Sequence, residues 1–575
     1  MNGIQTNLTV ENQSQKTLYW FLSIFSLWVI ALIIYSFHLS RWGHDGIHHL
    51  AGLAELYGPF SRGQFDTVLS PELHYGQGLP TFVFYSQMLY LPPFIFTLFG
   101  FGLTPSFSLT FISLIGVAWF GFFKLARLHA PANIAILGAT MFVGCNYFLG
   151  DIYTRFAYGE FFIYALLPFT LYSLNKAMLS ANHFAMLFAI LMLTTSILVH
   201  PISFMNLIPL LGVYCFLVLP DKAYFWNFLI KGLIITFSTI LLTSYFWLPG
   251  IIERPYVIGE SVGGINYSNS FWNFDRALLN TQHWLSLGPF LNCILLLTIC
   301  AQIFFIRSHF KTYSLLGCIF FYVFMCTPLS AFIWDSISIL QANQFVTRML
   351  MPLSIAVSLY FVYVANAWFK KPISATITLA LCLIILLQAS LFIYRHTKEI
   401  PSSATFAQTF PKDINTQLQY RLENYVTRTS GIGISEFKPN IELSEYLVSP
   451  TNDCGIKPPL PPYVKDIQRD NIVIAYNVNK KDCFLRLPII WNIRFKAIDH
   501  NGENLATGFN ENGTLMIETV STNGTIGLRF TEPSYVKWAT RISQLTLLTI
   551  VLVILFLQIR VRKKRISNSS RLSST

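Results

Sequence analysis

The chain has 575 residues, of which 53% are hydrophobic and only 11% are charged. This composition excludes an ordinary soluble globular protein, in which about a quarter of the residues are charged. Apolar runs of about 17–25 residues recur along most of the length, and each is long enough to cross roughly 30 Å of hydrocarbon. The formal net charge of +12 does not indicate a nucleic-acid partner. The basic residues lie mainly in short loops and at the C-terminus, where they report membrane topology.

The apolar runs predict an all-α polytopic membrane protein with about twelve transmembrane helices. The expected spans are 18–38, 104–126, 131–149, 161–178, 183–199, 202–219, 226–248, 286–306, 312–328, 350–369, 373–394 and 542–559. Basic inner loops then alternate with outer loops, so both termini are expected in the cytoplasm. The domains would be a tail at 1–17, a membrane domain at 18–395, an outer domain at 396–540, a last helix at 541–560 and a basic tail at 561–575. No small-residue cleavage site follows the first span, which is expected to be a retained signal anchor.

Residues 82–100 form an apolar stretch that we do not count as a span. Pro92 and Pro93 interrupt it, and a helix interior tolerates proline badly. If it crossed the membrane, Lys124 and Arg127 would fall on the side of the preceding loop, against the positive-inside rule. We therefore expect a broken interfacial element that extends the first outer loop to residues 39–103.

The segment 396–540 has a different composition, because long apolar runs stop and Asn, Pro, Thr and charged residues become frequent. Strands are expected at 471–476, 483–490, 494–498, 514–518 and 525–530, separated by Gly-containing turns. We expect a small β-rich extracytoplasmic domain before the last helix. Its cysteines, Cys454 and Cys483, would form a disulfide in an oxidising compartment, and two free cysteines are the alternative.

The first outer loop gathers ionisable residues in a chain that is poor in charge. Asp45 lies shortly after the first span, and His44, His48 and His49 surround it. His48 and His49 follow Asp45 by three and four residues, so a helical segment would place them on its face. A carboxylate held by imidazoles can take a proton from a hydroxyl group or bind a cation. A solvated loop acid beside interfacial histidines is the alternative.

Two further outer segments bring charge to the same side of the membrane. Asp151, Arg155 and Glu160 lie in the short loop that opens the next span, and Arg348 follows Gln344 at the start of a later one. An interfacial guanidinium suits phosphate recognition. The alternatives are that Glu160 stabilises a helix N-terminus and that Arg348 anchors its helix among lipid headgroups.

These motifs, in this order, resemble those of a known family. They are Asp45 with His49, Gly76-Gln-Gly78-Leu-Pro80 with Phe84-Tyr85, Tyr153-Thr-Arg155-Phe-Ala-Tyr-Gly-Glu160, and Gln344-Phe-Val-Thr-Arg348. The chain looks like a member of the YfhO-like bacterial membrane proteins, also named 6-pyruvoyl-tetrahydropterin synthase-related, within the GT-C superfamily of glycosyltransferases. The resemblance covers nearly the whole chain and includes the β-rich outer domain. The sequence departs from the family at Val346-Thr347, where a Pro-Trp pair is common.

The resemblance implies a GT-C-like enzyme of the bacterial inner membrane with its active site on the periplasmic face. It implies transfer of a sugar from a polyprenyl-phosphate donor to an envelope glycan, lipid or protein acceptor. It implies Asp45 as catalytic base or metal ligand and Glu160, ahead of Asp151, as the second acidic residue. We then expect His49 to orient Asp45, and Arg155 and Arg348 to bind the donor phosphate.

Six further residues are expected to line this site: His44, His48, Asp151, Tyr85, Gln344 and His200. No cofactor is indicated, although a divalent metal held by Asp45 and Glu160 is left open. A carrier of lipid-linked sugars is the main alternative function, and it would place ionisable residues at mid-membrane depth in broken helices arranged as repeats. A non-catalytic envelope assembly protein that binds through the β-rich domain is another.

Overall fold

The computed structural model describes most of the chain. The described residues are 16–32, 45–70, 78, 80–180, 182–219, 225–256, 267–272, 285–305, 310–341, 343–369, 373–399, 446–449, 453–454 and 472–572. His44, the N-terminal residues 1–15 and most of the segment 396–471 therefore lie outside the described residues.

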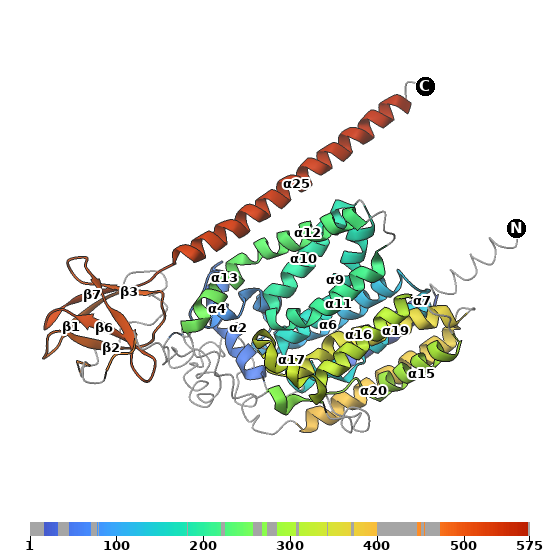
Figure 1. Ribbon diagram of the computed structural model, residues 1–575, viewed down its shortest axis with the longest axis horizontal. Coiled ribbons are helices and arrows are strands. Elements are labelled where there is room, and N and C mark those ends of the chain that lie inside the picture. The colour runs from blue at the N-terminus through green and yellow to red at the C-terminus, as the bar shows by residue number, and fades with distance from the viewer. Residues whose placement is uncertain are drawn as a thin grey trace. The chain divides into compact units, whose positions relative to one another are not determined.

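Helices make up most of the described chain (Figure 1), and the expected polytopic helical fold is confirmed. A helix suits a membrane because it satisfies its own backbone polar groups. Six described helices are long and apolar enough to cross a membrane, or up to eight if two bent pairs each count as one span. The six are α6 (Leu103–Ala126), α11 (Pro201–Val218), α12 (Phe225–Leu242), η7 (Val346–Met349) joined to α19 (Leu350–Trp368), α20 (Ala375–Glu399) and α25 (Ser534–Leu572).

The other helices at the expected spans are bent, short or less apolar, so fewer than twelve described helices qualify as spans. The bent pairs are α7 (Ala132–Val143) with α8 (Asn146–Tyr153), and α16 (Phe310–Cys326) with η6 (Pro328–Ser330) and α17 (Ala331–Ser336). Three shorter apolar helices are Lys16–Leu32, α10 (His183–Val199) and α15 (Pro289–Phe305). Helix α9 (Tyr158–Leu179) has 22 residues but is not among the six. Each expected span overlaps at least one described helix, but α10 and α15 have only 17 residues each. The run expected at 226–248 also divides, since α12 ends at Leu242 and α13 (Ser244–Glu253) follows.

The stretch 82–100 is broken, as expected from its prolines. It contains α4 (Thr81–Phe84), η1 (Gln87–Tyr90) and the eight-residue α5 (Leu91–Leu98). Both prolines lie in the first turn of α5, where the missing amide hydrogen costs no helical bond. An eight-residue helix is too short to cross a bilayer.

The chain divides into two units, which are described separately. The first unit contains Met1–Leu53, Met88–Gly232 and Ile265–Gln417. The second contains Ala54–Gln87, Leu233–Gly264 and Leu418–Thr575. Helix α2 (Gly46–Ser61) begins in the first unit and ends in the second.

The second unit holds two antiparallel sheets. The strands are β1 (Ile472–Asn477), β2 (Cys483–Ile490), β3 (Phe495–Ile498), β4 (Asn504–Leu505), β5 (Thr507–Phe509), β6 (Thr514–Thr519) and β7 (Asn523–Phe530). One sheet has the order β1-β7-β3-β4 and the other β2-β6-β5. In β2 buried and partly buried residues alternate up to its last two positions, as a strand with one face in a core requires. All five expected strands are present, and the short β4 and β5 were not predicted.

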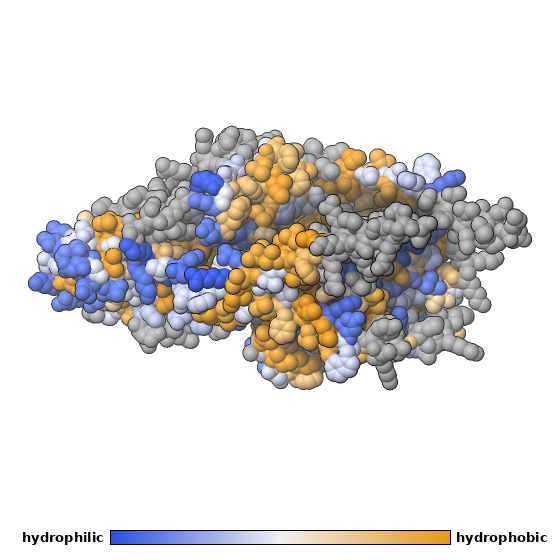
Figure 2. All heavy atoms as spheres, turned by 90° about the horizontal axis from the view of Figure 1, so that it is seen from above, coloured by the Kyte–Doolittle hydropathy of each residue, from blue (hydrophilic) through white to orange (hydrophobic). Residues whose placement is uncertain are grey.

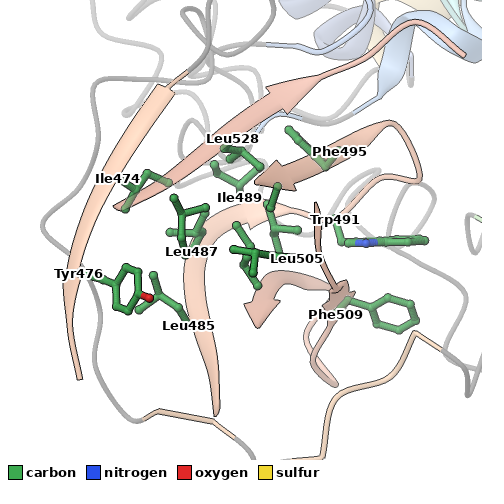
Figure 3. Close-up of a cluster of buried hydrophobic side chains, with 14 of the residues drawn as sticks. Ile474, Tyr476, Leu485, Leu487, Ile489, Trp491, Phe495, Leu505, Phe509 and Leu528 are labelled. Carbon is green, nitrogen blue, oxygen red and sulfur yellow. The ribbon is translucent and has the colours of Figure 1, made fainter. Parts of the chain in front are cut away.

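Side chains from both sheets share one buried core (Figure 3). Ile474 and Leu528 come from the first sheet, while Leu485 and Leu487 come from β2 of the second. Leu69, from the outer loop, is fully buried in the same cluster. Cys454 and Cys483 form a disulfide beside it, with their Cα atoms 5.2 Å apart. The core and the disulfide together hold the β-rich region.

Over the helices, the surface exposes many apolar side chains, as expected in a lipid environment. Figure 2 shows broad apolar areas there and mainly hydrophilic side chains over the β-strand region. On α12, Trp226 and Phe237 are 71% and 60% exposed, and on α25 Phe556 is 64% exposed. Such outward-facing apolar side chains are expected where lipid replaces water as the solvent.

Candidate active site

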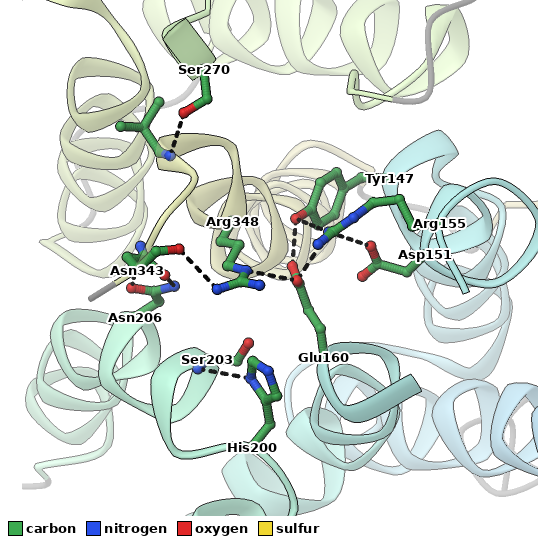
Figure 4. Close-up of polar contacts among 11 residues, drawn as sticks. Tyr147, Asp151, Arg155, Glu160, His200, Ser203, Asn206, Ser270, Asn343 and Arg348 are labelled. Carbon is green, nitrogen blue, oxygen red and sulfur yellow. Dashed lines mark hydrogen bonds and ion pairs between the residues drawn. The ribbon is translucent and has the colours of Figure 1, made fainter. Parts of the chain in front are cut away.

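The first unit contains a buried cluster of charged side chains centred on Glu160 (Figure 4). Glu160 lies in the first turn of α9, where the helix dipole favours a carboxylate. Its Oε2 accepts hydrogen bonds from Arg155 Nη1 at 3.0 Å and from Arg348 Nε at 3.2 Å. Its Oε1 accepts one from the Tyr147 hydroxyl. One carboxylate therefore joins α8, the turn after it, and the segment before α19.

Asp151 completes the cluster. Arg155 Nη1 also contacts Asp151 Oδ1 at 3.0 Å, and the second Asp151 oxygen has no hydrogen-bond partner among the described residues. Asp151 and Glu160 are at most 1% exposed, and Arg155 and Arg348 are each 7% exposed. Two cations thus balance two carboxylates, which is what burial of so many charges requires.

The chain around Arg155 explains how it reaches this position. The Arg155 and Thr154 amides both bond to the Gly150 carbonyl at the end of α8. Phe156, the next residue, has a φ of 56°, in a left-handed region that a bulky residue seldom adopts. The chain then turns into α9 with Glu160 only five residues after Arg155. This reversal brings the guanidinium and the carboxylate together.

Arg348 is held by a second set of contacts. Its Nη1 donates to the Asn343 carbonyl at 2.8 Å. The Asn343 side chain exchanges two hydrogen bonds of 3.0 Å with Asn206 of α11. Gln344, which lies between Asn343 and Arg348 in the sequence, has a φ of 62°. The position of Arg348 is thus fixed through α11 as well as through Glu160.

Asp45 lies beside this cluster and is exposed. Its amide donates to the Arg155 carbonyl at 2.8 Å, and its carbonyl accepts the His49 amide at 3.2 Å as the first bond of α2. Its carboxylate is close enough to act electrostatically on Arg155, yet forms no hydrogen bond with the described residues. The backbone therefore fixes Asp45 at the start of a helix and leaves its carboxylate available.

Two histidines, His48 and His49, follow Asp45 in α2. The His49 ring is 5% exposed, and its Nδ1 lies 3.4 Å from the Tyr90 hydroxyl, with Tyr158 packed edge-on. Burial lowers the pKa of His49 well below its usual value, and the charges of His48 and His200 lower it further. Burial also lowers the pKa of His48, although Asp45 opposes the shift. Both rings are therefore neutral near pH 7. Among the described contacts, the imidazole of His49 is bonded toward Tyr90 rather than toward the Asp45 carboxylate.

His200 lies between α10 and α11. Its Nδ1 accepts the Ser203 amide at 3.1 Å and so caps α11. Burial, with the nearby Arg348 charge, lowers the pKa of His200 to about 3. A Cβ on Gly159 would lie 2.8 Å from the His200 ring, so this glycine permits the close approach. His200 is a neutral neighbour of the cluster.

Two of the other expected residues are not among the described contacts of this cluster. Tyr85 belongs to the second unit, where it packs with Phe84 against Ile490. His44 lies outside the described residues. Tyr147, Asn206 and Asn343, which hold the cluster, were not predicted. Neutral polar residues within apolar runs were the available signal, since buried polar groups need partners.

The residues do not fit the divalent metal that the sequence left open. Oε1 of Glu160 accepts from Tyr147, and Oε2 accepts from two guanidinium groups. A cation at this carboxylate would meet two fixed positive charges at close range. Among the described residues, no group of three or more His, Cys, Asp or Glu converges as metal ligands do.

Fold and site together define a polytopic membrane protein with a charge-balanced buried cluster beside an exposed acid. No family model and no curated protein matches the chain. Solved structures that resemble it include the single-particle cryo-EM structure of arabinofuranosyltransferase AftD from Mycobacteria, with a TM-score of 0.45 and 11% sequence identity. The match covers 67% of this chain and 27% of the AftD chain, so this chain spans about a quarter of that one. Membership of the YfhO-like family stays a prediction.

Proposed function

We propose that this protein is a membrane glycosyltransferase that moves a sugar from a polyprenyl-phosphate donor to an acceptor in the cell envelope. The observation that carries the proposal is the pairing of Asp45 with the arginine cluster. The Asp45 carboxylate is exposed and has no hydrogen-bond partner among the described residues, while the Asp45 backbone amide donates to the Arg155 carbonyl at 2.8 Å. This backbone contact supports a base located near the proposed phosphate-binding arginines.

The proposed reaction is a single displacement. Asp45 takes the proton of the acceptor hydroxyl as its oxygen attacks the anomeric carbon. The bond from that carbon to the phosphate oxygen breaks, and the polyprenyl phosphate leaves with the electron pair. The product is inverted at the anomeric carbon. Polyprenyl phosphate is already a leaving group, so positioning and charge stabilisation supply most of the catalysis.

Arg348 and Arg155 are proposed to stabilise the departing phosphate. An arginine has five N–H donors in a rigid fork. Arg348 uses Nε for Glu160 and Nη1 for Asn343, and its Nη2 has no hydrogen-bond partner among the described residues. The proposed role of Glu160 is to position both guanidiniums, since two cations already neutralise its carboxylate. The resemblance implies Glu160 as the second acidic residue of the site, and here it is proposed as a positioning residue.

The remaining details follow from the same proposal. The lipid tail of the donor would lie among the apolar helices, and the site would face the periplasm of a bacterial inner membrane, with both termini in the cytoplasm. The disulfide in the β-rich region supports an oxidising compartment on that side. The acceptor class stays an envelope glycan, lipid or protein.

A carrier of lipid-linked sugars is the second candidate, and two helix breaks favour it. The pairs α7–α8 and α16–α17 bend by 43° and 86°, and broken helices are common in transporters. Purified protein in liposomes with a polyprenyl-phosphate sugar separates the two functions. Sugar transfer that requires an acceptor supports the glycosyltransferase. Movement of intact donor between leaflets, without consumption, would show a carrier instead.

A further inference from the structure

The ring of Phe345 lies over both arginines of the cluster. Its centroid is 5.4 Å from the Arg348 guanidinium carbon and 5.9 Å from that of Arg155. Both distances fall within the range in which a cation is attracted to an aromatic face. Phe345 is partly exposed, whereas both arginines are buried. One aromatic ring therefore lies within cation–π distance of two like charges.

The backbone that holds this ring has an uncommon conformation. Only three non-glycine residues among those described have a positive φ: Phe156, Gln344 and Asp482. Gln344 directly precedes Phe345, and Phe156 directly follows Arg155. Left-handed non-glycine residues persist where the surrounding contacts enforce them, and they gather at functional sites.

The turn at Gln344 is fixed on several sides. The Asn343 carbonyl accepts the Phe345 amide at 2.6 Å and Arg348 Nη1 at 2.8 Å. The Asn343 side chain is paired with Asn206. The Val346 amide donates to the Ser270 hydroxyl at 2.9 Å. These contacts fix the backbone on both sides of Phe345, from which its ring projects.

We infer that Phe345 is a positioning residue that holds Arg155 and Arg348 at their shared carboxylate and shields them from water. This inference rests on the proposed function and adds a specific residue to it. Two guanidiniums that share one carboxylate oxygen repel each other, and the negative face of the aromatic ring offsets part of that repulsion. The guanidiniums then meet the donor phosphate in a fixed orientation.

Fluorination of the ring tests this role directly. Phe345 is replaced by mono-, di- and trifluorophenylalanine, which keep the shape of the ring but weaken its attraction for cations. With a synthetic polyprenyl-phosphate sugar, kcat/KM should fall stepwise, by roughly tenfold at trifluorophenylalanine. Phe345→Leu should lose a similar factor and Phe345→Trp much less. A flat response across the fluorinated series overturns the inference, because a purely structural ring would be insensitive to its electrostatics.

A second readout does not depend on transfer. Phenylglyoxal modification of individual arginines is followed by mass spectrometry in the wild type and in Phe345→Ala. Arg155 and Arg348 should react several-fold faster in the variant, while the exposed Arg529 reacts equally in both. Equal rates at all three arginines overturn the inference. If the wild type transfers no sugar but the two arginines lose protection in the variant, the proposed function fails and the shielding role stands.

Discussion

Two buried ion clusters in this protein have similar chemistry but different surroundings. In the first unit, Glu160 is shared by Arg155 and Arg348. In the second unit, Glu253 at the end of α13 pairs with Arg494 just before β3. In both cases the carboxylate and its cations are at most 7% exposed.

The second cluster consists of Glu253, Arg494 and Tyr535 and links three elements. Arg494 donates from Nε and Nη2 to one oxygen of Glu253, and the Tyr535 hydroxyl of α25 donates to the same oxygen at 3.0 Å. Its contacts join α13, the β-rich region and α25. Burial and ion pairing alone therefore do not mark an active site. The cluster at Glu160 differs by its second arginine, its aromatic cover and the exposed Asp45 beside it.

Removal of the shared carboxylate should have the largest effect on stability. Glu160→Ala leaves two buried guanidiniums without their common partner, which should cost about 3–5 kcal/mol. The measurement is chemical unfolding in lipid nanodiscs, with the exposed Glu503→Ala as a control expected within about 0.5 kcal/mol of the wild type. A loss below about 1 kcal/mol for Glu160→Ala would show that the cluster is not stabilised by this carboxylate.

The ion pair of Glu253 and Arg494 in the second unit should be replaceable by two apolar residues with little loss of stability. Arg494→Met alone leaves Glu253 buried and unpaired, at a cost of about 3 kcal/mol. The double variant Glu253→Leu with Arg494→Met should return to within about 1 kcal/mol of the wild type, because apolar side chains of similar volume substitute well for a buried pair. Sugar transfer should be retained in the double variant. If stability is not recovered, the pair does more than fasten these elements.

Tyr147 and Tyr535 each donate a hydrogen bond to one of the two buried glutamates, so their effects on stability can be compared directly. Tyr147→Phe removes a hydrogen bond to the buried Glu160 and should cost roughly 1.5–2 kcal/mol. Tyr535→Phe removes the equivalent bond to Glu253, but Tyr535 is only half-buried, so about 0.5–1 kcal/mol is expected. Unfolding midpoints of the two single variants measure both. The reverse order would mean that the cluster at Glu160 has the weaker hydrogen-bond network.

The sequence predicted the fold well because its signals are local. Apolar run length located the helices, and alternation located the strands from Ile472 to Phe530. The contacts at the site are not local. Glu160 and Arg348 are 188 residues apart in the chain, and Asn206 and Asn343 are 137 apart. No spacing rule connects such residues.

Spacing also gave an incomplete view of Asp45. The interval from Asp45 to His49 predicted that the imidazole would orient the carboxylate. In the structure the His49 backbone amide donates to the Asp45 backbone carbonyl, and the His49 ring lies beside Tyr90. A helical interval fixes which residues are neighbours, but the packing of the surrounding aromatic residues decides where a ring points.

Sugar transfer by Asp45→Asn tests the central claim most directly. The variant is reconstituted in liposomes with a polyprenyl-phosphate sugar and an envelope acceptor, beside the wild type and Asp66→Asn, an exposed acid of the same outer loop. Loss of the base should lower kcat by at least about 100-fold, with no change in the unfolding midpoint because the Asp45 carboxylate is exposed. Asp66→Asn should transfer at the wild-type rate. Full transfer by Asp45→Asn would contradict the proposed mechanism.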